Sequence, residues 1–329
     1  MKGVLKKYAE WSCIGELNYC FYVPKGSESH RWLFNKSIEA ATFKIVNRVF
    51  RYVYLIKPIL IKGHREKHVI RYVGSDLSLL LILVSHRNIF LELHSNHMLE
   101  LKLRPGLEGK AAYFLEYFLQ RMCFKLSKGV VAPSLAIASF AHLHAPTFVL
   151  LNSCISKQVI RFSSEKKRKE IVIMASSFSE WHGLDDFQNF GSMLYSELGI
   201  KLRVIGAAQN IPDKEYIINS GFVEDEAKLC SLIGTALYAL DSLGYNKLKL
   251  DRSSSIKMFK YLESGTPVLS LVGPPIEDDN LSKSYNTFRN YQDMLNFLRN
   301  NMRYNFEIST ERFTKKNILK HEMNFYNEH

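Results

Sequence analysis

The segment SSIKMFKYLESGTPVLSLV (254–272) has residue types and spacing suited to binding a phosphate group. Its pattern predicts a helix that follows a strand and ends before a Gly-Thr-Pro turn. The first N–H groups of a helix lack intrahelical partners and the helix dipole is positive there, so helix starts attract anions. Ser254 and Ser255 are suitable N-caps, and Lys257 adds a positive charge. The pattern favours a diphosphate site, and an ordinary capped helix with a solvated lysine also fits it.

A second segment, SSFSEWHGLDDF (176–187), lies between a predicted strand and a predicted helix. Open α/β sheets bind their ligands beyond the carboxyl ends of their strands. Trp181, His182 and Gly183 place an aromatic face, a titratable ring and a flexible residue there. Packing by Trp181 and capping by His182 is the alternative. Two such loops in one half of the chain favour a nucleotide diphosphate site.

The elements that would position these loops alternate between short β-rich runs and longer helical stretches, which is typical of a parallel sheet wrapped by helices. In the second half we predict strands at 171–177, 201–207, 235–240 and 267–272, with helices at 185–198 and about 254–264. The first half has a similar rhythm, with strands predicted near 18–23, 68–73, 88–94 and 129–134. The stretch 161–170 carries five basic residues and no apolar periodicity, which predicts a linker between two α/β domains.

Composition narrows the classes of function. With 47% hydrophobic residues the chain can build large cores, and 44 basic against 32 acidic residues give a net charge of +12. That charge favours an anionic partner: nucleic acid, a phosphate-bearing substrate or an acidic membrane surface. The sequence has no zinc-ligand spacing, aromatic RNA-binding segment or arginine-rich arm, which argues against nucleic acid. The five scattered cysteines predict a reducing, cytoplasmic location, and no apolar run approaches the ~20 residues of a membrane span.

One stretch, 41–58, has the pattern of a basic amphipathic helix. Its apolar and basic residues fall on two stripes at helical spacing: Phe43, Val46, Phe50 and Val53 on one, and Lys44, Arg48 and Arg51 on the other. Such a helix can lie on an anionic bilayer, where each basic residue contributes about 1 kcal/mol. A helix with a buried apolar face and solvated charges gives the same pattern.

The motifs together resemble a known family. The pattern S-x-x-K-x-x-x-Y-L-x-x-G-x-P-V, which begins at Ser254, is similar to the donor domain of glycosyltransferase family 4, whose members have the GT-B fold. The Trp-His-Gly-x-Asp segment at 181–185 resembles that of a bacterial subgroup that builds surface polysaccharides. Further matches follow in order, including LELHSNHMLEL (91–101), KGVVAPS (128–134) and VIGA (204–207).

The resemblance implies two Rossmann-like domains that face each other across a cleft. It assigns an acceptor domain to 1–160, a donor domain to 171–305, and a tail at 306–329 that packs back on the first domain. His94 matches a first-domain histidine that faces the transferred sugar, although a buried structural histidine is the alternative. Glu92 matches an acidic position of the subgroup and joins His94 as a candidate catalytic residue.

The resemblance also assigns a donor site. His182 and Gly183 would lie beside the diphosphate. The backbone at Ser255 and Ile256, together with Lys257, matches a phosphate-binding helix start. Lys260 stands where the family has a glutamate that binds the donor ribose, and a lysine offers no acceptor for the hydroxyl groups. Glu263, on the same helical face, is the candidate substitute. Gly265 and Pro267 match the turn that closes the helix.

Two further departures from the family pattern stand out. Asp186 occupies a position where the subgroup has arginine, and the expected first strand with its glycine-rich loop is missing before Lys6-Lys7. Either the reading frame is shortened or the first sheet has one strand fewer. These departures, with Lys260, keep a second hypothesis open: a catalytically degenerate binding or scaffold protein.

The expected function is transfer of a sugar from a nucleotide-sugar donor to a glycan acceptor, lipid-linked, in surface polysaccharide synthesis. The family implies retention of anomeric configuration. We expect no cofactor and no metal, because the sequence has no Asp-x-Asp pair and adjacent Asp185 and Asp186 would diverge on a helix. The expected location is the cytoplasm, with peripheral binding to the inner face of the membrane.

Overall fold

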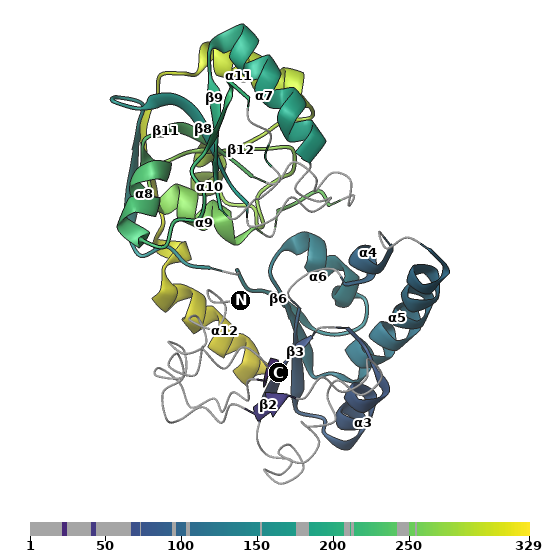
Figure 1. The fold of residues 1–329 in the computed structure, drawn as a ribbon. Helices are drawn as coiled ribbons and strands as arrows, with labels where there is room; N and C mark the ends of the chain where they lie inside the picture. The colour runs from purple at the N-terminus through teal and green to yellow at the C-terminus, as the bar shows by residue number, and fades with distance from the viewer. Residues whose placement is uncertain are drawn as a thin grey trace. The chain divides into compact units, whose positions relative to one another are not determined.

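The computed structural model describes residues 22–24, 41–43, 67–72, 74–93, 97–102, 106–151, 153–175, 184–206, 211, 214–241, 250–253 and 255–329. The chain divides into two compact units. The first comprises Met1–Asn152 with Leu319–His329, and the second comprises Ser153–Ile318. Figure 1 labels their elements along the chain.

The second unit is built on a six-stranded sheet in which all strands are parallel. Its order is β10-β9-β8-β11-β12-β13. The strands are β8 (Arg168–Met174), β9 (Lys201–Ile205), β10 (Ile217–Asn219), β11 (Ala236–Leu240), β12 (Val268–Ser270) and β13 (Tyr285–Thr287). The chain builds outward from β8 on one side, then returns to add β11 on the other. This reversal makes the sheet doubly wound and confirms the predicted Rossmann-like half.

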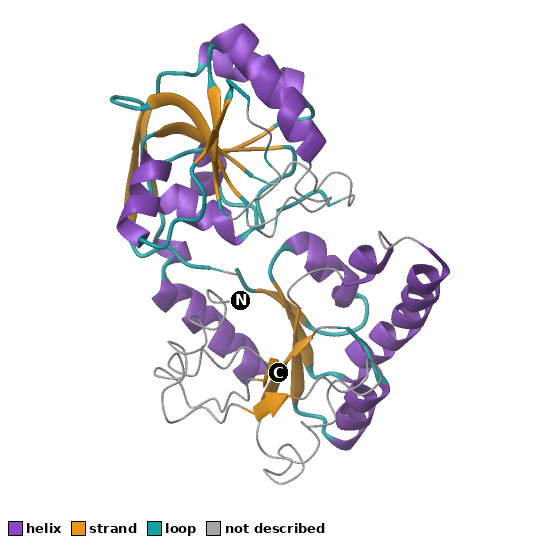
Figure 2. Cartoon of the chain, viewed as in Figure 1, coloured by secondary structure: helices purple, strands orange, loops and turns teal. Residues whose placement is uncertain are grey.

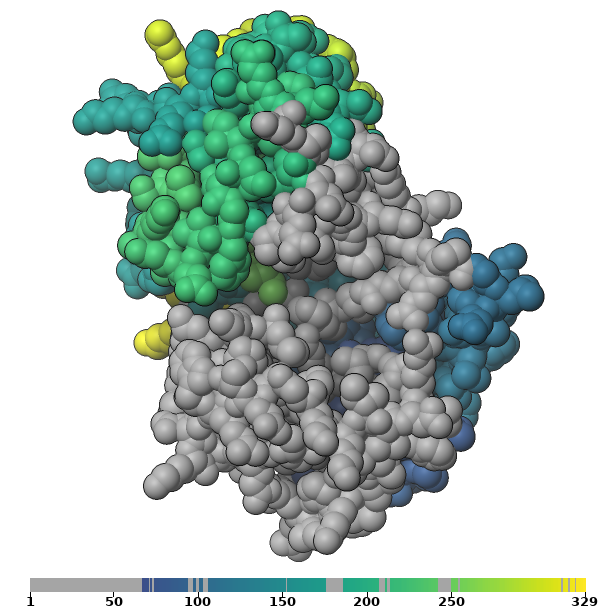
Figure 3. Space-filling view, viewed as in Figure 1, coloured from purple at the N-terminus to yellow at the C-terminus, as the bar shows by residue number. Residues whose placement is uncertain are grey.

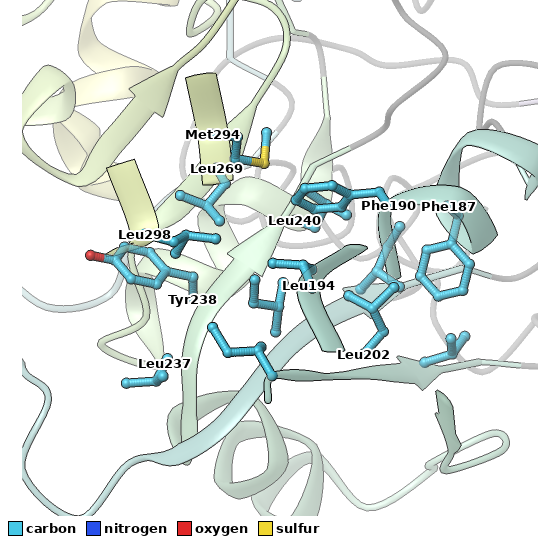
Figure 4. Packing of buried hydrophobic residues seen from close by; sticks show 14 of the residues in the cluster. Phe187, Phe190, Leu194, Leu202, Leu237, Tyr238, Leu240, Leu269, Met294 and Leu298 are labelled. Carbon is cyan, nitrogen blue, oxygen red and sulfur yellow. The ribbon is translucent and has the colours of Figure 1, made fainter. Parts of the chain in front are cut away.

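Helices cover both faces of this sheet (Figure 2). They are α7 (Leu184–Leu198), α8 (Glu226–Gly234), α9 (Ile256–Glu263), α10 (Asp279–Ser284) and α11 (Tyr291–Asn300). On one face, α7 and α11 bury an apolar core against the strands, where Phe190, Leu194, Leu240 and Met294 meet (Figure 4). All five residues of β11 are buried, as expected for a central parallel strand covered on both faces.

The stretch 161–170, predicted as a linker, is instead largely strand. It holds the end of β7 (Val159–Ser163) and the start of β8, and β7 pairs antiparallel with β14 (Asn305–Ser309). Inward-facing Ile160 and Phe162 alternate with exposed residues, and Phe162 stacks on Phe306 with ring centroids 4.8 Å apart. The linker prediction was wrong because charged outward residues concealed this short period-2 pattern.

The boundary between the units also differs from the predicted one. The chain divides at Asn152, ahead of the predicted residue 160. The predicted tail is split: β14 and the short 3₁₀ helix η4 (Glu311–Phe313) belong to the second unit, while 319–329 belong to the first. Helix α12 (Lys315–Glu328) therefore starts in one unit and ends in the other.

The first unit contains a four-stranded parallel sheet in the order β3-β4-β5-β6. Its strands are β3 (His68–Tyr72), β4 (Ile89–Leu93), β5 (Gly129–Ala132) and β6 (Thr147–Val149). The connecting helices are α3 (Leu77–Ser85), α4 (His97–Lys102), α5 (Gly106–Leu126) and α6 (Leu135–His142). Each strand neighbours the next one along the chain, so right-handed crossovers place these helices on one face of the sheet.

Alternation along β4 divides its side chains between the two faces. Ile89 and Leu91 join the core beneath α3 and α5. Phe90 points the other way and contacts the rings of Phe325 and Tyr326 on α12, at centroid distances of 5.8 Å and 4.8 Å. Figure 1 shows the connecting helices on one side of these strands and α12 on the other. The C-terminal helix therefore serves as the second layer of the first unit.

Two further strands, β1 (Tyr22–Pro24) and β2 (Ala41–Phe43), form a parallel pair. The predicted amphipathic helix at 41–58 therefore does not begin at residue 41, and the rest of that stretch lies outside the described residues. The start of the chain before Tyr22, where a first strand was expected to be missing, also lies outside them. No helix in the described part of the chain is long and apolar enough to cross a bilayer.

Candidate functional site

The strongest candidate site lies in the second unit, between β8 and β11, where the order in which the chain adds strands to the sheet reverses. Ligands of doubly wound sheets bind beyond the carboxyl ends of the strands at this switch point. Asp241 follows directly after β11, and α9 begins fifteen residues later at Ile256. Ser253 and Ser255, just before α9, are linked to Asp241 by hydrogen bonds, so the helix start that the sequence singled out belongs to this edge, whereas residues 176–183 after β8 lie outside the described residues.

A buried carboxylate organises the edge. Asp241 is fully buried, and its Oδ2 accepts hydrogen bonds from the Ser253 hydroxyl at 2.6 Å and the Tyr285 hydroxyl at 2.9 Å. Burial, followed by the nearby negative charge of Asp241, raises the pKa of Tyr285 well above its ordinary value. Tyr285 therefore remains a neutral donor to this carboxylate. The cluster connects β11, the segment before α9, and β13.

Lys257 is the most unusual side chain at the site. Its Nζ is buried and has no hydrogen-bond partner among the described residues. Burial lowers the pKa of the Lys257 ammonium to about 8, and the charge of Asp241 acts in the opposite direction. An unpaired buried ammonium is costly unless an anion compensates for its lost hydration. The buried Lys257 ammonium is therefore suited to pairing with an anion.

The first turn of α9 offers further donors. Ser255 is the N-cap residue, yet its side chain makes no capping hydrogen bond. Its hydroxyl is buried and unpartnered within the described part of the chain. Its own N–H donates to the Ser253 hydroxyl at 3.0 Å, which connects the helix start to the Asp241 cluster. A helix start with uncapped N–H groups, a free hydroxyl and a buried ammonium is suited to a phosphate group.

The other end of α9 is fixed in place. Gly265 has φ of +71° and donates from its N–H to the Leu262 carbonyl, while the Thr266 N–H donates to the Tyr261 carbonyl. This is a Schellman motif, in which glycine takes the left-handed position at low cost. Lys167 donates from Nζ to the Gly265 carbonyl at 2.9 Å. The helix is therefore held rigidly behind the candidate site.

Gly206 brings the ends of two strands close together. It follows β9 with φ of +143°, and a Cβ atom there would lie 1.9 Å from the Ala175 carbonyl oxygen. No side chain fits in this space. The close approach draws the end of β9 against the end of β8, at the last described residue before 176–183.

Two residues that the resemblance assigns to the donor site, Lys260 and Glu263, interact with other side chains instead. The Lys260 ammonium pairs with the Glu226 carboxylate of α8. Burial lowers the pKa of Lys260, but hydrogen bonds to Glu226 and Cys230 outweigh that effect and raise it. Glu263 accepts hydrogen bonds from the Ser156 N–H, at 3.1 Å, and from the Ser156 hydroxyl. Within the described part of the chain, neither side chain has a hydrogen bond to the Asp241 cluster.

Other predicted site residues are placed as follows. Ile256 is the first residue of α9, and more than a third of its surface is exposed. Glu92 lies in β4 of the first unit, with a half-buried side chain. His94, His182 and Gly183 lie outside the described residues, so their roles stay predictions.

Sequence reasoning missed three members of the buried cluster: Asp241, Ser253 and Tyr285. Asp241 carried a signal, because it directly follows the predicted strand 235–240 and polar residues at such strand ends face the ligand edge. Ser253 lies next to a segment that was singled out. Tyr285 had no local signal, since it joins the cluster from β13, 44 residues away from Asp241.

Comparison with known proteins rests on structure. No protein-family model and no curated protein sequence matches the chain. Solved structures do match: the pneumococcal O-GlcNAc transferase GtfA in complex with UDP and GlcNAc aligns with a TM-score of 0.54 at 11% identity, and TarM with 0.53 at 13%. The sucrose-phosphate synthase of Thermosynechococcus elongatus aligns with 0.53 at 10%. The chain has a GT-B fold.

These alignments cover 84% of the chain for GtfA and TarM and 87% for the sucrose-phosphate synthase. The chain spans 59% of GtfA, 57% of TarM and 80% of the synthase. At such low sequence identities, the structural similarity is evidence for the fold alone. It confirms the predicted GT-B architecture of two Rossmann-like units, while the narrower family and subgroup stay predictions.

Proposed function

We propose that the chain is a glycosyltransferase that binds a nucleotide-sugar donor at the start of α9. The observation that carries this proposal is the buried Lys257 ammonium, which has no hydrogen-bond partner in the described part of the chain. It lies in the first turn of a helix whose N-cap makes no capping bond. The GT-B fold supports the same assignment, and GtfA, one structural neighbour, was solved with UDP and GlcNAc.

The geometry suits departure of a nucleoside diphosphate. When the glycosidic bond to the diphosphate breaks, negative charge grows on the leaving phosphate oxygen. Lys257 and the first N–H groups of α9 stabilise charge where it develops, which is commonly the largest catalytic contribution. The Ser255 hydroxyl adds a neutral donor. Asp241 accepts a hydrogen bond from Ser253, which in turn accepts one from the Ser255 N–H. In this way Asp241 positions the helix start without itself contacting the ligand.

We further propose that His182 and Gly183 complete the diphosphate site and that His94 and Glu92 act on the sugar. The resemblance to glycosyltransferase family 4 supports these roles, together with a metal-independent, retaining reaction. The same resemblance supports a glycan acceptor, lipid-linked, in bacterial surface polysaccharide synthesis. Such an acceptor would bring the enzyme to the inner face of the membrane as a peripheral protein.

A second candidate function is a donor-binding scaffold that no longer transfers sugar. One observation favours it: Lys260, at the position of the family's ribose-binding glutamate, pairs with Glu226 instead. A site that has lost its ribose acceptor would bind donors weakly. Turnover separates the two candidates, because only the enzyme releases nucleoside diphosphate from a nucleotide sugar.

The test is a thermal-shift panel of UDP, GDP and their sugar conjugates, with and without EDTA. A ligand present at 100 times its Kd adds about 2.7 kcal/mol to the free energy of unfolding, which raises Tm measurably. We expect stabilisation that is insensitive to EDTA and absent in Lys257→Met. Lys228→Met, at an exposed lysine on α8, is the matched control and should behave as the unmodified chain.

Two results would contradict the proposal. Stabilisation that survives in Lys257→Met would place the nucleotide elsewhere, and stabilisation abolished by EDTA would require a metal. Binding without release of nucleoside diphosphate from any sugar conjugate in the panel would instead favour the scaffold.

A further inference from the structure

The helix layer of the first unit presents apolar side chains to its outside. Among the described residues, most exposed large apolar side chains belong to this unit, and those on α3 and α5 are Leu77, Leu81, Val84, Leu107, Phe114, Leu115, Phe118, Met122 and Leu126. In the second unit the corresponding residues are Val159, Phe222 and Ile256, which lie on separate elements. Scattered apolar residues are normal on a protein surface, whereas a gathered set marks an interaction site.

Helix α5 departs from the usual separation of polar and apolar faces, although its inner face also buries Cys123 and Phe124. Its inner face buries Glu116 and Gln120, while Phe114 and Phe118 are 63% and 62% exposed. The inward orientation of Glu116 is fixed, because its carboxylate accepts hydrogen bonds from the Ser75 N–H at 2.9 Å and from the Tyr72 hydroxyl. A helix that faced only water would carry its polar residues outside. The outer face of α5 is therefore suited to a less polar environment.

The exposed apolar residues form continuous stripes. On α5, residues 107, 111, 114, 118 and 122 recur at intervals of three or four, so they share one face. On α3, Leu77, Leu81 and Val84 follow the same spacing, and the two helices pack side by side over β4. The atoms of α5 reach the molecular surface in Figure 3, where they are drawn in blue.

The charged side chains around these apolar stripes indicate which kind of partner the face would bind. In the helix layer between residues 74 and 128, the exposed basic side chains described are Arg87, Lys102, Lys110, Arg121, Lys125 and Lys128. Against these six, Glu108 is the one exposed acidic side chain that the structure describes there. A second copy of the chain would bring like charges together across the patch. Apolar stripes flanked by basic residues are instead the pattern of helices that lie in the interface of an anionic bilayer.

We propose that the outer face of α3 and α5 docks on an anionic lipid surface. Phe114, Phe118 and Met122 enter the boundary between headgroups and acyl chains, while Lys110, Arg121 and Lys125 contact lipid phosphates. The docking surface is distinct from the predicted amphipathic stretch 41–58. The proposal rests on the peripheral membrane binding in the proposed function and gives that binding a surface, but it needs no part of the α9 site, so lipid docking and nucleotide binding can each fail while the other stands.

The experiment is flotation of the full chain with vesicles of phosphatidylcholine alone or with 40 mol% phosphatidylglycerol, a composition chosen to supply about the charge of an anionic leaflet. We expect binding to the anionic vesicles that high salt releases. Phe114→Gln with Phe118→Gln should reduce the partition coefficient at least tenfold. Lys110→Gln, Arg121→Gln and Lys125→Gln together should reduce it about 100-fold at low salt.

Matched controls come from the second unit. Phe222→Gln removes an equally exposed aromatic residue, and Lys169→Gln, Lys214→Gln and Lys228→Gln remove three exposed positive charges. These variants should bind vesicles as the unmodified chain does. All variants should keep its Tm and its UDP response, which separates a docking defect from misfolding or loss of the α9 site.

Three outcomes would overturn the proposal: no binding to anionic vesicles, equal loss in the control variants, or loss confined to Lys44→Gln, Arg48→Gln and Arg51→Gln in the stretch 41–58. A dimer in analytical ultracentrifugation that Phe114→Gln with Phe118→Gln dissociates, without vesicle binding, would assign the face to a second copy instead.

Discussion

The hydroxyl of Tyr261, in the middle of α9, accepts a hydrogen bond of 2.7 Å from the backbone N–H of Met174, the last residue of β8. Tyr261 is fully buried. The bond ties the helix that begins at the candidate phosphate site to the strand that leads into the loop containing His182. A tyrosine of the family-like motif therefore ties α9 to the last residue of the strand that precedes the second singled-out segment.

Tyr261→Phe should weaken nucleotide binding as well as stability. Loss of a buried hydrogen bond costs about 1–2 kcal/mol, and here it also frees the end of β8 from α9. Tyr238→Phe is the control, because its hydroxyl donates to the Asn301 carbonyl at 2.6 Å, on an element outside the candidate site. Urea unfolding should show similar losses for both variants, while UDP titration should show weaker binding for Tyr261→Phe alone. Equal UDP affinity in the two variants would refute a positioning role for Tyr261.

Gly206→Ala should be far more damaging than Gly199→Ala. At Gly206 a Cβ atom would lie 1.9 Å from a backbone oxygen, so β8 and β9 would have to separate. We expect a loss of about 3 kcal/mol or more in the free energy of unfolding. Gly199 has φ of +64° with open space around it, so its alanine variant should lose only about 1 kcal/mol. Urea denaturation measures both, and comparable losses would contradict the close approach at Gly206.

The core of the second unit was predictable because its signals are local. The strands β8, β9, β11 and β12 are short apolar runs, and buried parallel strands read as continuous apolar sequence. Helix α9 was predicted because its start, its apolar face and the Gly265 turn all lie within a dozen residues. Where residues close in sequence carry the information, the prediction agrees with the structure.

Relationships between distant segments could not be predicted in this way. Asp241 meets Tyr285 across 44 residues, and Lys260 meets Glu226 across 34. No spacing rule connects these pairs, since the fold alone brings them together. The strand β7 was missed for a related reason: its pairing with β14 joins residues about 146 positions apart, and its own apolar pattern spans only Ile160 and Phe162.

The salt bridge between Lys260 and Glu226 allows a test of donor affinity. Lys260→Glu alone should destabilise the protein by about 1 kcal/mol, because it would place carboxylates together on α8 and α9. Glu226→Lys combined with Lys260→Glu should restore the pair with reversed charges and recover stability. If the lysine weakens an otherwise competent donor site, the double variant should bind UDP-sugars about 1–2 kcal/mol more tightly, the scale of a hydrogen bond to a charged group.

Calorimetric titration of the double variant, with Glu226→Lys alone as control, checks this expectation. Recovered stability with unchanged affinity would show that residue 260 does not face the donor ribose.

Lys257 should make both stability and ligand binding depend on pH. Burial lowers its pKa from 10.5 to about 8 in the folded chain, so between those values the unfolded chain holds a proton that the folded chain has released. Stability should therefore rise with pH from about 8 to 10.5, and Lys257→Met should remove this rise.

A bound diphosphate acts in the opposite direction, because its negative charge favours the protonated ammonium. Nucleotide phosphates are fully ionised above pH 7.5, so Lys257 governs the proton balance of binding there. UDP affinity should fall about eightfold between pH 7.5 and 9.0 as the lysine loses its proton. Calorimetry in two buffers of different ionisation enthalpy should detect proton uptake on binding that approaches one per UDP at pH 9.0. Binding without proton uptake, or an equal pH dependence in Lys257→Met, would mean that the buried ammonium does not meet the diphosphate.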